Sequence, residues 1–245
     1  MNYIYKQTEY LQDMKRHYCP GCTHGIVHKI VGEALEELGL LDDVITVGPV
    51  GCSGLIHHYS TKDAMHSLHG RAAAVATGIK AVFPNKIVYT NQGDGDLISI
   101  GCAETVHAAA RSTNITVICV NNCLYGMTGG QMSATTLEDQ KTTTSSDGRV
   151  LQRDGHPIKI AELLATIPGA AFVARGSLHD VKHINQAKKY LIEAFKCQKE
   201  KKGYSYVELL STCPTNWHID PVNSLKWIEQ EMIPNYPLGV KKEVV

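Results

Sequence analysis

The chain has 245 residues, of which 43% are hydrophobic and 20% charged, and 24 Lys and Arg balance 24 Asp and Glu. This is the composition of an ordinary globular protein, and with no basic stripe or polybasic tail it argues against nucleic-acid or membrane-surface partners. No apolar run approaches the roughly 18 residues of a membrane span, and the N-terminus lacks a signal-peptide core. We therefore expect a cytoplasmic protein.

Apolar, β-branched runs alternate with amphipathic segments along the chain, which predicts strands and helices in turn. Such alternation is typical of an α/β fold, with a mostly parallel sheet and helices on both faces. No linker or internal repeat interrupts the pattern, so we interpret residues 1–245 as a single domain. In chain order the pattern predicts a helix at 24–40, a strand at 43–47, a helix at 72–82, a strand at 87–90, a helix at 97–111, a strand at 115–120, a helix at 158–167, a strand at 171–174, a helix at 178–200, a strand at 206–210 and a helix at 224–232.

Four short polar segments follow predicted strands. Ligands of parallel sheets bind outside the carboxyl ends of the strands, so these segments are expected to converge on one edge. They are residues 51–53, 93–96, 121–128 and 213–214. The Gly-, Ser- and Thr-rich stretch at 128–156 is too long to be a mere connector, and we expect it to be functional.

The segments Gly93-Asp94-Gly95-Asp96 and Asn121-Asn122 are separated by about one strand–helix–strand unit. A carboxylate from Asp94, an amide oxygen from Asn122 and the backbone carbonyl of Leu124 could hold Mg²⁺, which prefers oxygen ligands and keeps phosphates in its shell. Glycines at 93 and 95 would let a diphosphate approach the backbone, and the helix expected from about residue 97 would offer it N–H groups. The alternative is a plain strand–turn–helix connection. A calcium EF-hand is excluded, because its twelfth position would be Thr105 and not Glu.

Eight cysteines in a cytoplasmic protein are not expected to form structural disulfides. The pair Cys19-x-x-Cys22 is compatible with zinc, an iron–sulfur centre or a redox dithiol. Together with Cys52 and Cys213, which also lie in predicted loops, it supplies the four thiolates of a [4Fe–4S] cluster, although zinc is nearly as compatible with these residues alone. The other four cysteines are interpreted as packing residues: Cys102, Cys119, Cys123 and Cys197.

These segments together resemble a known family. Gly-Asp-Gly followed by Asn-Asn is similar to the motif for thiamine diphosphate (TPP) and Mg²⁺. Cys-Pro-Gly-Cys at 19–22, Gly-Cys-Ser at 51–53, His-Gly-Arg at 69–71 and Tyr-Gly-Met-Thr-Gly-Gly-Gln at 125–131 resemble the β subunit of 2-oxoacid:ferredoxin oxidoreductases, from about residue 17 to residue 240. The tail at 211–217 and 236–240 is most similar to the 2-oxoisovalerate type.

The resemblance implies roles for particular residues. It implies Mg²⁺ ligation by Asp94, Asn122 and the Leu124 carbonyl, and a [4Fe–4S] cluster on the same four cysteines named above. His69 is implied to act at the reaction centre as a catalytic residue. TPP-binding residues are then expected to be Gly51, Cys52, Ser53, His69, Gly70, Arg71, Gly93, Gly95, Asp96, Gly126, Met127 and Thr128. For Arg71 the alternative is an ion pair with an acid inside the fold.

The implied reaction is oxidative decarboxylation of a 2-oxoacid with coenzyme A to acyl-CoA and CO₂, with electrons leaving through the cluster to ferredoxin. The activating Glu of TPP enzymes is expected on a partner α subunit, with ferredoxin-like γ and δ subunits as further partners, so the chain alone should turn over nothing. Leu55 stands where 2-oxoglutarate-using relatives place a basic residue, which favours 2-oxoisovalerate over 2-oxoglutarate. The other readings are a non-oxidative TPP-dependent decarboxylase or synthase and a non-catalytic metal-cluster subunit.

Overall fold

The computed structural model describes residues 6–244, and its strands form one seven-stranded sheet in the order β2-β1-β3-β4-β6-β5-β7. All neighbouring strands are parallel except β7, which runs antiparallel to β5 at one edge. The mostly parallel sheet predicted from the sequence is therefore confirmed. The strands are β1 (Val44–Gly48), β2 (Asp63–His66), β3 (Ile87–Gly93), β4 (Thr116–Asn121), β5 (Ala170–Ser177), β6 (Tyr204–Leu210) and β7 (Gly239–Glu243).

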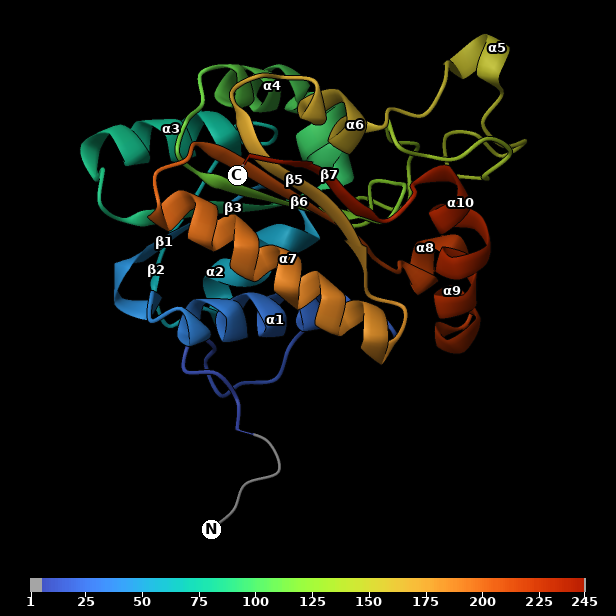
Figure 1. Cartoon of the computed structure of the whole chain (residues 1–245). Coiled ribbons are helices and arrows are strands. Elements are labelled where there is room, and N and C mark those ends of the chain that lie inside the picture. Colours follow the sequence, from blue (N-terminus) through green and yellow to red (C-terminus); the bar gives the residue numbers. More distant parts are fainter. Residues whose placement is uncertain (1–5, 245) are drawn as a thin grey trace.

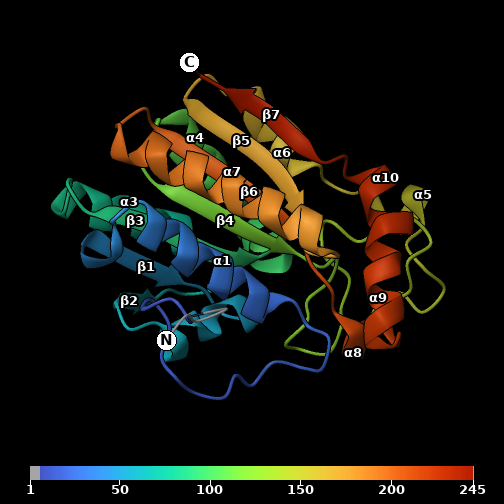
Figure 2. The same ribbon diagram turned by 60° about the horizontal axis from the view of Figure 1, so that its bottom comes forward.

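Helices cover both faces of this sheet (Figures 1 and 2). On one face lie α1 (His24–Glu37) and α7 (Val181–Lys199), and on the other lie α3 (Ala72–Val82), α4 (Cys102–Ala110) and α6 (Ile160–Ala165). Shorter helices complete the fold. They are α2 (Ile56–Tyr59), α5 (Leu151–Asp154), α8 (Pro214–Trp217), α9 (Pro221–Trp227) and α10 (Ile233–Asn235), with π-helical turns at Gly95–Ile100 and Ile228–Met232.

The central strand β4 shows why its sequence contains a run of apolar residues from which a strand could be predicted. Successive side chains of a strand point to opposite faces, and Ile118 and Val120 join the core under α1 and α7. Val117 and Cys119 join the core under α3, α4 and α6. Because both faces are covered, every residue of β4 is buried, and the strand contains an apolar run at 117–120.

Two strands were not predicted from the sequence, and several helices begin at other residues than expected, among them α9, which begins at Pro221 rather than at 224. The edge strand β2 is exposed along its length and β7 ends in Lys-Lys-Glu, so neither carries an apolar signal. The helix expected at 97–111 begins at Gly95 as a π-helical turn and continues as α4 only from Cys102. The helix expected from residue 178 begins at Val181, because the Asp180 side chain caps it by accepting the His183 N–H at 2.8 Å.

The segment 128–156 is ordered around one buried arginine. Arg149 is 5% exposed, and its guanidinium donates to backbone carbonyls on both arms of the segment. The acceptors are the carbonyls of Ser133, Ala134, Thr136, Asp154, Gly155 and His156. Only α5 breaks the irregular path, at the far end of the segment (Figure 1). Within residues 6–244, every helix is too short or too polar to traverse a lipid bilayer.

Candidate active site

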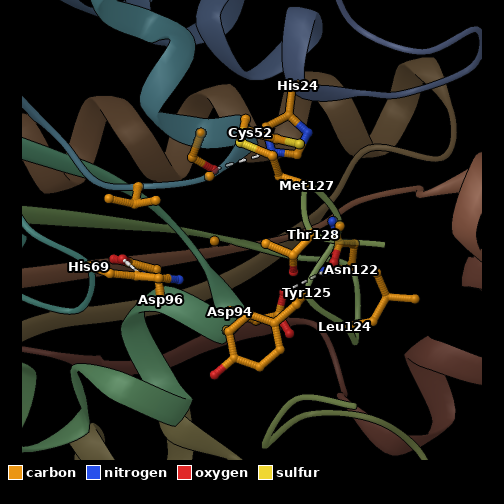
Figure 3. A pocket seen from close by; sticks show the side chains of 16 residues that line it. His24, Cys52, His69, Asp94, Asp96, Asn122, Leu124, Tyr125, Met127 and Thr128 are labelled. Atoms are coloured by element: carbon orange, nitrogen blue, oxygen red, sulfur yellow. Dashed lines mark hydrogen bonds and ion pairs between the residues drawn. The ribbon is translucent and has the colours of Figure 1, made fainter. Parts of the chain in front are cut away.

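A pocket opens at the carboxyl ends of β1, β3 and β4, the place expected for ligands of a parallel sheet. Three of the four predicted polar segments meet there (Figure 3). The predicted residues that line it are Gly51, Cys52, Ser53, His69, Gly93, Asp94, Gly95, Asp96, Asn122, Leu124, Gly126, Met127 and Thr128. His24, Val50 and Tyr125 line it as well, although no role was expected for them from the sequence.

Three oxygen donors converge at one side of this pocket. The Asn122 amide faces Asp94 Oδ1 at 3.1 Å and the carbonyl oxygen of Leu124 at 2.8 Å. With its nitrogen turned inward, the amide would donate to both oxygens. With its oxygen turned inward, three oxygens face one another, which is an arrangement that a cation stabilises. A carboxylate, an amide oxygen and a carbonyl are the hard oxygen donors that Mg²⁺ prefers, so the donor set fits this ion.

The carboxylate of Asp94 accepts hydrogen bonds from residues of the segment 128–156. Ser133 Oγ and Thr135 Oγ1 each donate to Asp94 Oδ2 at 2.6 Å, and the Asn122 N–H donates to Oδ1 at 3.3 Å. Burial raises the pKa of Asp94 to about 6, while these hydrogen bonds act to lower it. A cation beside Oδ1 would favour the ionised form. The two hydroxyls thus fix Oδ2 and leave Oδ1 facing the other oxygens.

The double replacement S133A/T135V should weaken Mg²⁺-dependent TPP binding. Hydrogen-bonding partners of metal ligands typically contribute about 10–100-fold to affinity, and we expect a loss in that range. Isothermal titration with TPP and Mg²⁺ measures it. T166V is the matched control, because Thr166 is exposed at the end of α6 and its hydroxyl bonds only the Leu163 carbonyl. Unchanged affinity in S133A/T135V would mean that Asp94 needs no support.

His69 is oriented by a buried acid on the next strand-end loop. Its Nδ1 pairs with Asp96 Oδ1, which also accepts the Gly70 N–H at 2.7 Å, while Gln92 Nε2 donates to Oδ2 at 2.6 Å. Burial raises the pKa of Asp96, and the donors around it counter this. Since the carboxylate accepts, Nδ1 carries the ring proton and Nε2 is left as the free nitrogen. Asp96 therefore positions His69 at the pocket wall.

Two glycines lie where the loops that line the pocket approach one another. A Cβ on Gly95 would come within 2.5 Å of the Tyr125 ring, so glycine is required for the close approach of these two loops. The Tyr125 ring meets His69 edge-on, with 6.1 Å between ring centroids. A Cβ on Gly126 would lie 3.5 Å from Cys213 Sγ and 3.6 Å from the Asn122 amide nitrogen. The Gly126 backbone therefore lies between the predicted magnesium ligands and a predicted cluster ligand.

Three predicted residues lie outside the pocket lining. The Arg71 guanidinium is half exposed and pairs with Glu104, which matches the ion-pair alternative for this residue. Gly70 lies beside the pocket, where its N–H contacts Asp96. Leu55 is partly buried and packs against the core under α1 and α7. Its proposed contact with substrate stays a prediction, and the packing gives Leu55 a structural role.

The four predicted cluster cysteines come together from three separate segments. In every pair of these thiols, the charge of one raises the pKa of the other, which places all four close to one another. Burial is the larger cause, and it raises the pKa of Cys22 to about 12 and that of Cys52 to about 11. Without a cation the Cys22, Cys52 and Cys213 thiols would therefore stay protonated.

The spacing of the thiols bears on which metal they fit. Among the described residues, no three cysteine sulfurs lie within 4.8 Å of one another. A single zinc ion with bonds of about 2.3 Å holds its sulfurs about 3.8 Å apart. A cluster is a larger body than one ion and keeps its thiolates farther apart, so the observed spacing fits the cluster better.

His24 links these thiols to the pocket. Its Nδ1 lies 3.2 Å from Cys22 Sγ and its Nε2 lies 3.2 Å from Ser53 Oγ. The ring is fully buried and stacks on Tyr18 at 5.2 Å, and burial lowers its pKa to about 4. A neutral imidazole thus connects a predicted cluster ligand with a residue of the pocket wall.

Comparisons with known proteins agree with this geometry. A family model described as thiamine pyrophosphate enzyme, C-terminal TPP binding domain, matches residues 49–209. Ketoisovalerate oxidoreductase subunit VorA of Methanothermobacter thermautotrophicus is 42% identical over 91% of this chain and 46% of its own length. The 2-oxoglutarate synthase subunit KorB of Methanocaldococcus jannaschii is 36% identical over 91% of this chain and 80% of its own length.

The chain belongs to the TPP-binding β-subunit family of 2-oxoacid:ferredoxin oxidoreductases. The resemblance drawn from the sequence is thereby confirmed. A solved structure with the same fold is 2-oxoglutarate:ferredoxin oxidoreductase from Magnetococcus marinus with 2-oxoglutarate, coenzyme A and succinyl-CoA bound. It is 27% identical, with a TM-score of 0.79 over 99% of this chain and 86% of that chain. The chain spans about half the length of its VorA relative.

Proposed function

We propose that the chain is the TPP-binding β subunit of an enzyme that oxidises a 2-oxoacid with coenzyme A to acyl-CoA and CO₂. The observation that carries the proposal is that a candidate Mg²⁺ and TPP pocket lies next to a candidate iron–sulfur site. Three converging oxygens line a pocket at the strand ends, and four electrostatically coupled thiols adjoin it through Cys52 and Cys213. A non-oxidative TPP enzyme has no use for the second site.

Most of the site residues would hold the cofactors, and one residue, His69, would transfer a proton. Asp94, Asn122 and the Leu124 carbonyl would hold Mg²⁺ and through it the diphosphate of TPP. When bound, TPP supplies the electron sink for decarboxylation. His69, fixed by Asp96, can accept or donate a proton at Nε2 beside the reacting atoms. Cys19, Cys22, Cys52 and Cys213 would hold the [4Fe–4S] cluster that passes electrons on to ferredoxin.

The pocket is only half of a TPP site. None of its lining residues is a glutamate, whereas TPP activation in this family is expected to use a Glu on an α subunit. We therefore infer an α subunit as the partner that completes the site. The family resemblance also leads us to propose γ and δ subunits as further partners and the cytoplasm as the compartment. Val50 and Met127 are 39% and 50% exposed at the pocket and are available to such a partner.

Metal analysis after anaerobic purification tests the proposed function. We expect about four irons per chain and a brown protein with broad visible absorbance. The purified chain should bind TPP weakly and oxidise no 2-oxoacid until an α subunit is added. Zinc in place of iron, absence of metal, or turnover by the single chain would each overturn the assignment of roles.

The favoured substrate is 2-oxoisovalerate or a related branched-chain acid. No lysine or arginine lines the pocket, so this chain offers no cationic side chain to the second carboxylate of 2-oxoglutarate. The higher identity to the VorA relative points the same way. On the assembled enzyme, kcat/KM should be higher for 2-oxoisovalerate than for 2-oxoglutarate by about tenfold or more, as for an unpaired buried charge. The reverse preference would refute the choice.

A further inference from the structure

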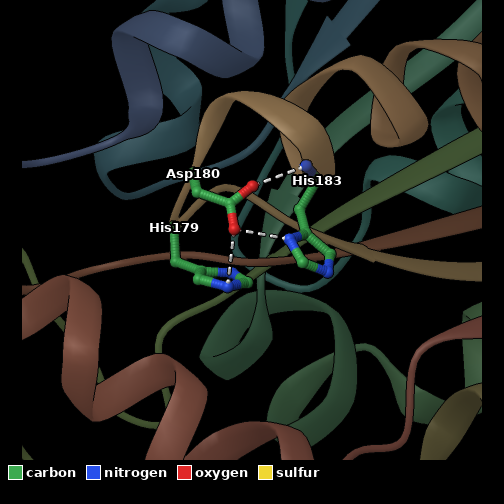
Figure 4. A group of neighbouring side chains, drawn as sticks. All are labelled: His179, Asp180 and His183. Carbon is green, nitrogen blue, oxygen red and sulfur yellow. Dashed lines mark hydrogen bonds and ion pairs between the residues drawn. The ribbon is translucent and has the colours of Figure 1, made fainter.

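A second group of metal-ligating side chains lies away from the pocket, where β5 passes into α7. His179 and Asp180 stand in the connection, and His183 is in the first turn of the helix. Figure 4 shows both imidazole rings turned toward the Asp180 carboxylate. Asp180 Oδ2 lies 3.2 Å from His179 Nε2 and 2.8 Å from His183 Nδ1. One ligand atom from each residue falls within 4.8 Å of the others.

The donor types and spacings suit a tetrahedral ion. Zinc bonds to imidazole nitrogen and carboxylate oxygen are about 2.0–2.2 Å, which puts neighbouring ligand atoms about 3.3–3.5 Å apart. The separation from Asp180 Oδ2 to His179 Nε2, 3.2 Å, is close to that range, whereas the separation to His183 Nδ1, 2.8 Å, is shorter by roughly half an ångström. Small rotations of the Asp180 and His183 side chains would open the group enough for an ion to replace the protons that these side chains share.

The supporting contacts orient two of the three ligands. Ser177 Oγ is buried and lies 2.8 Å from His179 Nδ1, the ring nitrogen that does not face Asp180. Such a partner on the second ring nitrogen is usual for metal-binding histidines. Asp180 Oδ1 is occupied by the His183 N–H at 2.8 Å, so Oδ2 is the oxygen left for an ion.

The site is also accessible and has room for a fourth ligand. The side chains of Asp180 and His183 are 46% and 30% exposed, whereas that of His179 is 6% exposed. Glu229, on the π-helical turn after α9, is near enough for its charge to raise the pKa of His179, although burial and the charge of His183 together leave that pKa lowered. A water molecule can complete the coordination.

We propose that His179, Asp180 and His183 form a zinc-binding site that ties the end of β5 to the start of α7. The alternative is a helix cap whose carboxylate merely hydrogen-bonds two histidines, and it predicts that no ion binds. None of the three residues lines the TPP pocket, so this proposal stands or falls independently of the proposed function.

The test uses the chain with its cysteine site loaded with iron, titrated with Zn²⁺ and, in parallel, with Co²⁺ as a spectroscopic probe. The variants are D180N, which keeps a helix-capping oxygen, and H183A. The matched control is H107A, which removes an exposed histidine from α4. Iron content is measured in the same samples, so that metal exchange at the cysteines is detected.

Wild type and H107A should bind one zinc ion per chain, with cobalt absorption bands of nitrogen and oxygen ligation and no thiolate-to-cobalt bands. D180N and H183A should bind at least about tenfold more weakly, and added zinc should raise Tm only in wild type and H107A. The proposal is overturned if wild type shows no zinc binding in this titration. Equal binding by all four proteins would overturn it as well.

Discussion

Replacing Asp94 by Asn is expected to abolish Mg²⁺-dependent TPP binding and, with it, turnover of the assembled enzyme. The change keeps the size of the side chain but removes the negative charge from a fully buried position. Removing a partner of a metal ligand already weakens binding about 10–100-fold, so losing a charged ligand should weaken it at least about 100-fold. The Ser133 and Thr135 hydroxyls, which donate to Asp94 Oδ2, would also lose a carboxylate acceptor.

Calorimetric titration with TPP and Mg²⁺, run beside an assay of 2-oxoacid oxidation, measures both effects. D147N is the matched control, because Asp147 is exposed and pairs only with Arg153 at the surface. Iron content should be unchanged in both variants, which separates a local effect from misfolding. Full activity in D94N would support instead a subunit that only docks and stabilises a catalytic partner.

The ends of the central strands could be predicted from the sequence because apolar residues of a buried parallel strand are followed by polar residues at the edge of the sheet. The strands that end at Gly93 and Asn121 are buried on both faces, and each contains an apolar run, at 87–89 and at 117–120. The polar residues that follow are therefore conspicuous, and parallel topology brings them to one edge. The edge strands β2 and β7 could not be predicted in this way, since water or polar side chains cover them and no hydrophobic pattern marks them.

The supporting contacts of the site were beyond sequence reasoning for a different reason. Ser133 and Thr135 reach Asp94 across roughly 40 positions of chain. Only the path of the loop, held by Arg149, places them there. His24 follows the Cys-Pro-Gly-Cys motif closely, and that proximity was the one available signal of its contact with Cys22. Local patterns thus identify ligands, whereas their orienting partners depend on tertiary packing.

Replacing Cys213 by Ser is expected to remove the iron–sulfur cluster while leaving the TPP pocket formed. Cys213 precedes α8 and accepts a hydrogen bond from Asn216 Nδ2 at 3.2 Å, which a serine oxygen can also accept. The fold should therefore tolerate the change. A serine hydroxyl is a much weaker ligand of iron than a thiolate, so iron should fall well below about four per chain. Electrons from the 2-oxoacid would then have no route to ferredoxin.

Iron and sulfide analysis, visible absorbance and electron paramagnetic resonance of the reduced protein follow the cluster directly. TPP affinity should change little, because Asp94, Asn122 and the Leu124 carbonyl are untouched. C102S is the matched control, since Cys102 is also partly buried but stands in α4, away from the four thiols. Iron retained in C213S, or iron lost equally in C102S, would show that the cluster is held elsewhere. Loss of iron with TPP binding intact would establish that two separable sites, joined at Gly126, make up this half of the enzyme.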